Sequence, residues 1–229
     1  MAQIHDNVAR VRERMAQACF RAGRRPEDVK LLAVTKTVPA ERIRQAYEAG
    51  LRDFGENRVQ EANAKRAALS DLTVTWHLVG HLQSNKAKLA RQLFHWVHSV
   101  DSLRLAEKLE HAAVCEGERL PVLLEVNLGG EATKSGVGEE EVLELAGQVA
   151  QFKTLDLCGL MTVPPFLENP EDVRPFFRRL RQLAERIGAA LPDVSLRELS
   201  MGMSHDYEVA IEEGATIVRV GTAIFGARQ

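Results

Sequence analysis

Residues 31–57 read LLAVTKTVPAERIRQAYEAGLRDFGEN, and this stretch contains one complete cycle of strand, helix and strand. The apolar runs 31–36 and 53–57 have the length and composition of short buried strands. Between them, segment 39–49 places apolar residues at helical spacing, with Glu and Arg on the opposite face. Such a helix supplies the crossover that two parallel strands require. The stretch therefore predicts a protein of the α/β class.

The same cycle recurs along the chain. Eight strand-like runs cover residues 31–36, 53–57, 76–80, 96–100, 121–127, 157–163, 196–202 and 216–221. The clearest helical segments between them cover residues 39–49, 103–115, 139–152 and 173–187. This alternation suits either an open doubly wound sheet or a closed barrel. The number of runs favours a (β/α)₈ TIM barrel.

The first twenty residues predict an extra helix that precedes this barrel. Ile4, Val8, Val11, Met15 and Cys19 recur at intervals of three and four residues, as on one face of an amphipathic helix. Charged residues interrupt the segment early, so we expect neither a signal peptide nor a spanning helix. The longest loop is expected at 164–170, which contains three prolines. We see no linker, and expect residues 1–229 to form a single domain.

Composition indicates an ordinary globular chain. Of the 229 residues, 45% are hydrophobic and 27% charged, and the formal net charge is -2. Basic and acidic residues alternate, so we expect no binding to nucleic acid or membranes. Cys19, Cys115 and Cys158 are odd in number and far apart, which argues against a disulfide framework. A cytoplasmic location suits this cysteine content.

Lys36 is the first candidate for chemistry. It ends the first strand-like run, and the pleat that turns Leu32 and Val34 inward would turn its side chain inward too. In a barrel, the carboxyl ends of the strands surround the active site, so the strand-end residues should meet in one cavity. A poorly solvated lysine has a lowered pKa and becomes a nucleophile for carbonyl groups. The alternatives are a lysine that extends into solvent, or one paired with Glu56.

Arg219 is the second candidate. It lies within TIVRVG, on the same strand face as Ile217 and Gly221. A buried guanidinium is costly without a partner. A structural carboxylate, such as Glu198 or Glu56, would satisfy it, and so would a ligand atom that accepts a hydrogen bond, such as a pyridine nitrogen. The sequence leaves both readings open.

The loops after the last two strand runs have the features of a phosphate site. In VGTAIFG, a turn at Gly221 and Thr222 opens a short helix, the place where many barrels bind phosphate. In LSMGMS, Gly202 permits close approach of the backbone, and Ser200 and Ser204 supply hydroxyl groups. Each loop alone is a weak signal, and together they favour a phosphate-bearing ligand.

Other kinds of site lack support. His77 and His81 are four residues apart, but the residues between them predict a strand and a turn, so we expect no metal site. His95 and His98 flank Trp96 and Val97 of the fourth run, and a hydrogen-bonded structural histidine is the default for both. The chain has no nucleophile elbow, Walker loop or dinucleotide-binding glycine pattern.

Six segments together resemble the YggS/PROSC family of pyridoxal phosphate homeostasis proteins. They are AVTKTV at 33–38, FGENRVQE at 54–61, WHLVGHLQSNK at 76–86, VNLGGEATKSG at 126–136, GLMTVPP at 159–165 and LSMGMSHDYEVAIEEGATIVRVGTAIFG at 199–226. The resemblance implies a barrel like the N-terminal domain of alanine racemase, with pyridoxal 5'-phosphate held as a Schiff base on Lys36. It further implies that Arg219 faces the pyridine nitrogen. Ser200, Gly202, Gly221 and Thr222 would surround the phosphate, and Asn57, His77 and Met161 would lie near the ring.

With these residues we expect a cofactor carrier without catalytic residues. An arginine beside the pyridine nitrogen leaves that atom unprotonated, which weakens the ring as an electron sink. A racemase also needs a base on each face of the substrate. Fold-type III racemases take one of them, a tyrosine, from a second domain, which this chain is expected to lack. Of its two tyrosines, Tyr47 is expected to be structural and Tyr207 to lie nearer the rim of the barrel.

The leading hypothesis is a monomer that stores pyridoxal phosphate or delivers it to apo-enzymes that use this cofactor. The second hypothesis is a weak amino-acid racemase that uses the same lysine. The third is a barrel like the class I aldolases, in which the lysine forms a Schiff base with a sugar phosphate. Such an aldolase would be colourless, and borohydride would trap it only with substrate present.

Overall fold

Eight parallel strands close into a barrel in sequence order, in a computed structural model that describes residues 2–113, 117, 119–130 and 135–226. The strands are β1 (Lys30–Val34), β2 (Asp53–Glu56), β3 (Thr75–Leu78), β4 (Trp96–Val100), β5 (Leu120–Glu125), β6 (Leu155–Met161), β7 (Glu198–Met203) and β8 (Ile217–Val220). Pairing of β1 with β8, from Lys30 opposite Ile217 to Ala33 opposite Val220, closes the ring. Every strand run expected from the sequence is present within one or two residues at each end, and the predicted barrel is confirmed.

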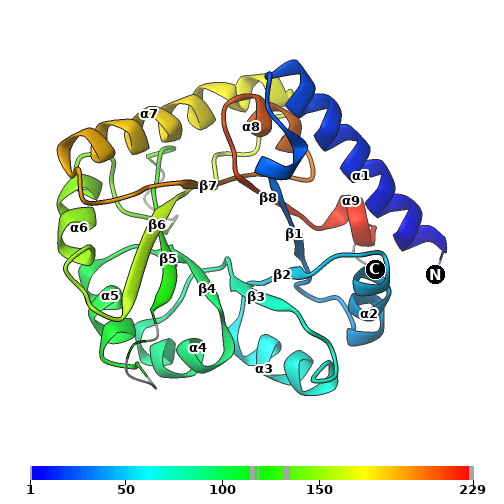
Figure 1. Cartoon of the computed structure of the whole chain (residues 1–229), viewed down its shortest axis with the longest axis horizontal. Coiled ribbons are helices and arrows are strands. Elements are labelled where there is room, and N and C mark those ends of the chain that lie inside the picture. Colours follow the sequence, from blue (N-terminus) through cyan, green and yellow to red (C-terminus); the bar gives the residue numbers. More distant parts are fainter. Residues whose placement is uncertain (1, 114–116, 118, 131–134, 227–229) are drawn as a thin grey trace.

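Helices surround the barrel, as Figure 1 shows. They are α1 (Ala2–Arg21), α2 (Ala40–Glu48), α3 (Val59–Ala68), α4 (Ala87–Leu93), α5 (Leu103–Glu110), α6 (Val142–Val149), α7 (Arg174–Ala190), α8 (Tyr207–Glu212) and α9 (Thr222–Phe225). Three short 3₁₀ turns, Pro26–Asp28, Ser84–Lys86 and Pro170–Val173, complete the elements. Residues 162–169 contain no helix or strand, which confirms the expected proline-rich loop.

The N-terminal helix α1 covers the outside of the last barrel units. Its predicted apolar face, from Ile4 to Cys19, is buried, and the helix lies against α8, α9 and α2 (Figure 1). Asn7 Nδ2 donates to the carbonyl oxygen of Ile224 in α9, at 2.9 Å. After the helix, Arg24 Nη1 donates to the carbonyl oxygens of Ile211, in α8, and Ala215, which follows it, both at 2.8 Å. The extra helix therefore fixes the position of the short helix that follows β8.

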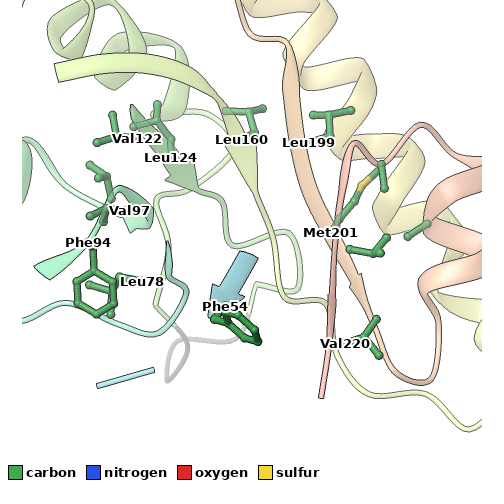
Figure 2. Packing of buried hydrophobic residues seen from close by; sticks show 14 of the residues in the cluster. Phe54, Leu78, Phe94, Val97, Val122, Leu124, Leu160, Leu199, Met201 and Val220 are labelled. Atoms are coloured by element: carbon green, nitrogen blue, oxygen red, sulfur yellow. The ribbon is translucent and has the colours of Figure 1, made fainter. Parts of the chain in front are cut away.

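The hydrophobic core has two layers. The larger layer fills the space between the strands and the helices and includes Phe54, Leu78 and Leu160 (Figure 2). A smaller cluster occupies the barrel interior and consists of Leu32, Leu123, Cys158, Met161 and Ile217. Because side chains alternate across a strand, Leu32 faces inward while Ala33 faces the helices. The small apolar cluster leaves room in the interior for polar side chains.

Some expectations concern features outside the site. Cys19 and Cys158 are buried free thiols, whereas Cys115 lies outside the described residues. Residues 131–134, within the segment 126–136, also lie outside them. Within the described part of the chain, no helix combines the length and apolar character needed to cross a membrane.

Candidate functional site

Lys36 lies at the carboxyl end of β1, in a cavity of about 510 Å³ that it shares with Gly221 and Thr222. The two chain segments meet because β1 and β8 are neighbours in the closed barrel. Gly221 allows this approach, since a Cβ atom there would lie 3.3 Å from the carbonyl oxygen of Val34. The Arg42 side chain, from α2, lines the same cavity. The cavity thus combines an amine, a hydroxyl group and a guanidinium.

The turn that opens α9 presents backbone N–H groups beside this cavity. Ser204 Oγ accepts hydrogen bonds from the N–H groups of Gly221, at 3.1 Å, and Ala223, at 3.3 Å. Arg42 donates to the carbonyl oxygen of Phe225, at 2.5 Å, which holds the guanidinium at the end of the short helix. A phosphate here would bind the guanidinium, and it would replace Ser204 Oγ as the acceptor of these two N–H groups.

The charged side chains of Glu56 and Glu61 both contact that of Lys65, next to Lys36. Glu56 is fully buried, and its Oε1 accepts hydrogen bonds from Thr35 Oγ1, at 2.5 Å, and Lys65 Nζ, at 2.7 Å. Burial raises the pKa of Glu56, whereas the bonds from Lys65 and Thr35 oppose the rise. The carboxylate that the sequence offered to Lys36 is therefore bound by Lys65 and Thr35.

The same charges fix the backbone on both sides of Lys36. Lys65 Nζ donates to the carbonyl oxygen of Thr35, at 2.6 Å, and to Glu61 Oε1, at 2.6 Å. Glu61 Oε1 also accepts from the N–H of Thr37, at 2.5 Å. Thr37 has a φ of 63°, a left-handed conformation that is unfavourable for a threonine and needs support of this kind. Residues of α3 thus determine how the lysine is presented.

Arg219 points into the barrel interior and is only 4% exposed. Its Nη1 donates to the carbonyl oxygen of Ser200, at 2.6 Å, and to Ser200 Oγ, at 2.8 Å, while Nη2 donates to the carbonyl oxygen of Thr162, at 2.8 Å. Burial lowers the pKa of Arg219 to about 10, so the group stays charged at neutral pH. No carboxylate of the described residues lies within ion-pair distance of it. The structural-carboxylate reading is therefore wrong.

His77 and His98 lie side by side in the same interior, and both are fully buried. His77 Nδ1 is 3.0 Å from His98 Nε2, and His77 Nε2 is 3.0 Å from Asp53 Oδ1. His98 Nδ1 is 2.9 Å from Ser200 Oγ, so the default expectation of a hydrogen-bonded structural histidine is confirmed for His98. Across the described ranges, no three His, Cys, Asp or Glu side chains gather as a metal site.

The resemblance also implies roles for Met161, Asn57 and Gly202. Met161 is fully buried in the interior apolar cluster, while Asn57 is half-buried after β2 and its backbone packs against Gly80. Gly202, with a φ of 90°, lies against α8, where a Cβ atom would be 2.5 Å from Ala210 Cβ. Neither Ser200 nor Gly202 lines the cavity that contains Lys36.

The predicted site residues thus fall into two groups. Lys36, Gly221 and Thr222 line one cavity, and His77, Ser200 and Arg219 form a hydrogen-bonded set in the interior. Asn127 lines another cavity, of about 1110 Å³, beside α7, and the expectation of a single cavity for all strand-end residues stays a prediction. The connection between the groups is the short segment from Arg219 to Gly221.

Sequence reasoning missed the roles of Asp53, Glu61, Lys65 and Thr162. Glu61 and Lys65 are four residues apart on a helix, which usually indicates an exposed ion pair. Only Lys65's low exposure, 9%, distinguishes it, and that follows from packing. Asp53 was recognised as the start of a strand, but nothing local predicted its bond to His77.

Tyr207 is the first residue of α8, the helix that follows β7. It is 2% exposed and is buried at the start of α8, next to α1, with the guanidinium carbon of Arg14 5.8 Å from its ring centroid. Its hydroxyl group is buried, with no hydrogen-bond partner among the described residues. The expectation that Tyr207 lies nearer the rim stays a prediction, and the structure adds that its side chain is buried beside α1.

Comparison with known proteins gives the family. The family model described as "Alanine racemase, N-terminal domain" matches residues 1–229. A relative from Aquifex aeolicus named "Pyridoxal phosphate homeostasis protein" is 50% identical over 224 residues, which are 98% of each chain. This chain belongs to the pyridoxal phosphate homeostasis protein family. The Escherichia coli K12 member of the family is 43% identical over 236 residues, covering 100% of this chain and 98% of that one.

Solved structures agree with this family. PipY of Synechococcus elongatus, whose structure is described as having PLP bound, matches with a TM-score of 0.87 and 41% identity, covering 98% of this chain and all of PipY. An alanine racemase from Clostridium difficile matches all of this chain and 57% of its own, with a TM-score of 0.73 and 16% identity. At this identity, the likeness to the racemase shows the fold alone.

Proposed function

We propose that this chain binds pyridoxal 5'-phosphate through a Schiff base with Lys36 and stores or delivers it, maintaining the supply of the cofactor in the cell. The observation that carries the proposal is the shared cavity of Lys36, Gly221 and Thr222. It joins a carbonyl-reactive amine to a turn with phosphate-binding chemistry. The names of the relatives and the cofactor described for PipY support the same function.

The residues present fit the cofactor. A cavity of about 510 Å³ is within the usual size range of small-molecule sites. The amine of Lys36 would hold the aldehyde carbon, and the turn from Gly221 to Ala223, with Thr222 Oγ1 and Arg42, would hold the phosphate. Arg219 would donate a hydrogen bond to the pyridine nitrogen. When bound, the cofactor supplies a reactive aldehyde and a ring that can accept electrons.

Storage or delivery suits these residues better than catalysis. Because Arg219 keeps its proton at neutral pH, it would donate to the ring nitrogen and leave that nitrogen unprotonated, which restrains carbanion chemistry. The burial of Tyr207 next to α1 removes the tyrosine that we considered as a second base. The alternative of a weak racemase requires two bases that reach the substrate α-carbon.

The deciding experiment is an absorption spectrum. We expect a yellow protein whose visible band disappears on reduction with borohydride and does not form in Lys36→Ala. Lys88→Ala, which removes an exposed lysine of α4, is the matched control and should keep the band. A colourless wild-type protein that ignores added pyridoxal phosphate would refute the proposal. Trapping by borohydride only in the presence of a sugar phosphate would support the aldolase alternative.

The cellular part of the proposal concerns location and partners. We propose a cytoplasmic monomer that passes the cofactor to apo-enzymes requiring it. Mass measured in solution tests the monomer. Activation of an apo-enzyme by the loaded protein, compared with an equal amount of free cofactor, tests delivery. Exchange of an amino-acid α-proton into deuterated water at an enzyme-like rate would favour the racemase instead.

A further inference from the structure

A continuous row of hydrogen bonds crosses the barrel interior and ends on Arg219. It begins at Asp53, the first residue of β2, and continues through His77 in β3 and His98 in β4 to Ser200 in β7. The successive distances are 3.0, 3.0 and 2.9 Å, and the last step, from Arg219 Nη1 to Ser200 Oγ, is 2.8 Å. Five strands, β2, β3, β4, β7 and β8, contribute to this one row.

Asp53 determines the direction of the row. An ionised carboxylate only accepts hydrogen bonds, so His77 must carry its proton on Nε2. The Nδ1 atom of a neutral His77 is then an acceptor, and His98 must donate to it from Nε2. The remaining nitrogen of His98, Nδ1, accepts in turn from the hydroxyl group of Ser200. The hydrogen bonds of the row are therefore all donated in one direction, from Ser200 to His98, from His98 to His77 and from His77 to Asp53.

This direction leaves the oxygen of Ser200 available to Arg219. The hydroxyl proton faces His98, so the lone pairs of Ser200 Oγ accept the hydrogen bond from Arg219 Nη1. The reverse direction would require a protonated Asp53. Lys30 Nζ lies 3.6 Å from Asp53 Oδ1, and although burial raises the pKa of Asp53, the hydrogen bond from His77 and the charge of Lys30 leave it below its ordinary value. Burial also lowers the pKa values of both histidines, which favours their neutral forms.

The outer end of the row lies at the opposite end of the barrel from Lys36. Asp53 and Lys30 are the first residues of their strands and line a cavity of about 470 Å³, whereas Lys36 lies two residues beyond the end of β1. Packing keeps the row in place, since the rings of His77 and Trp96 are stacked with centroids 5.8 Å apart. The amine of Lys30 lies 5.2 Å from the Trp96 ring.

We propose that Asp53 is a positioning residue for Arg219: it fixes the tautomers of His77 and His98, and these fix the Ser200 hydroxyl group that holds the guanidinium. The effect on the cofactor rests on the proposed function, in which Arg219 faces the pyridine nitrogen. The tautomers are a property of the protein without cofactor. The two parts can therefore be tested separately.

The test combines nitrogen-15 NMR of the histidine rings with absorption titrations using pyridoxal phosphate. In the cofactor-free wild type we expect both rings to be neutral and protonated on Nε2. Asp53→Ala removes the acceptor, so both rings should populate both tautomers. Its affinity for pyridoxal phosphate should fall about tenfold, the effect of losing one orienting hydrogen bond, and the visible band should shift.

Three further variants make the result specific. Asp53→Asn keeps an acceptor oxygen beside Lys30 and should retain the tautomers and the affinity. Ser200→Ala breaks the row at its other end, so it should weaken binding to the same extent and leave His77 protonated on Nε2. It also serves as the second probe if Asp53→Ala fails to fold. Asp71→Ala, which removes an exposed aspartate paired with Arg44, should behave as wild type.

Two results would overturn the inference. One is a wild-type spectrum in which either ring is charged or carries its only proton on Nδ1. The other is unchanged affinity and absorption in Asp53→Ala and Ser200→Ala while the wild type binds the cofactor normally. A wild-type protein that does not bind pyridoxal phosphate at all refutes the proposed function, and the NMR result then decides the direction of the row by itself.

Discussion

Lys65 Nζ lies 2.6 Å from the carbonyl oxygen of Thr35, the residue immediately before Lys36. The same amine binds Glu56 and Glu61, and Glu61 holds the N–H of Thr37. One buried ammonium group on α3 therefore joins the two residues that flank the proposed cofactor lysine. This arrangement makes both folding and cofactor binding sensitive to Lys65.

Lys65→Met should destabilise the protein and weaken cofactor binding. Removing Lys65 leaves the buried negative charge of Glu56 without its cation, which costs about 3 kcal/mol of unfolding free energy. Affinity for pyridoxal phosphate should fall about tenfold, because the backbone around Lys36 loses an orienting contact. Urea denaturation and absorption titration measure the two effects.

Two further variants separate the charge effect from the loss of the side chain. Adding Glu56→Gln to Lys65→Met removes the uncompensated charge and should restore part of the stability. Lys88→Met, at an exposed position of α4, should change neither quantity. Wild-type stability in Lys65→Met would show that the buried cluster contributes nothing.

Gly202→Ala should reduce the free energy of unfolding by about 3 kcal/mol, from a left-handed conformation unfavourable for alanine and from overpacking. The φ of Gly202 is 90°, and the added Cβ would lie 2.5 Å from Ala210 Cβ and 3.0 Å from Tyr207 Cα. Gly188→Ala in α7 is the control, since a Cβ there meets nothing within 4 Å. It should stabilise the helix by about 1 kcal/mol. Equal melting temperatures for the two variants would contradict this account.

Glu125→Gln should stabilise the protein above neutral pH. Burial, with a smaller effect of Asp101, raises the pKa of Glu125 to about 7, although Arg219 opposes the rise. Between the ordinary value of 4.5 and about 7, the folded state keeps a proton that the unfolded state releases, so this group lowers stability as pH rises. The penalty is complete above pH 7 and amounts to about 3 kcal/mol.

Denaturation of the wild type and Glu125→Gln across this pH range measures the difference. The variant should be more stable at pH 8, and the two proteins should converge below pH 4.5. A difference that does not change with pH would show that Glu125 titrates normally.

Arg219→Glu should shift the visible band of the bound cofactor and weaken its binding at least about tenfold. The change replaces a donor with an acceptor opposite the carbonyl oxygens of Ser200 and Thr162, so it should also lower stability. Arg104→Glu, at an exposed position of α5, is the control for the change in net charge. An unaltered band and affinity in a folded Arg219→Glu protein would refute the placement of the pyridine ring.

The fold was predictable because its signals are local. The face of α1 and the alternation of strands and helices follow from spacings of a few residues, which reveal the side of an element that is buried. The proximity of Lys36 to Gly221 and Thr222 was also predictable, because β1 and β8 must be neighbours once the barrel closes. The partners of Arg219 and of Glu56 were not predictable, since several carboxylates and carbonyl groups were equally compatible with the sequence.

The sequence by itself determined the order of the strands and helices, the amphipathic first helix and the residues that resemble a cofactor site. Only the tertiary structure decided that Lys36 shares a cavity with Gly221 and Thr222, while Ser200 binds His98 and Arg219 inside the barrel. The physical reason is that a repeating pattern specifies which face of a strand is buried. The register around the closed barrel specifies which buried side chains come within hydrogen-bonding distance.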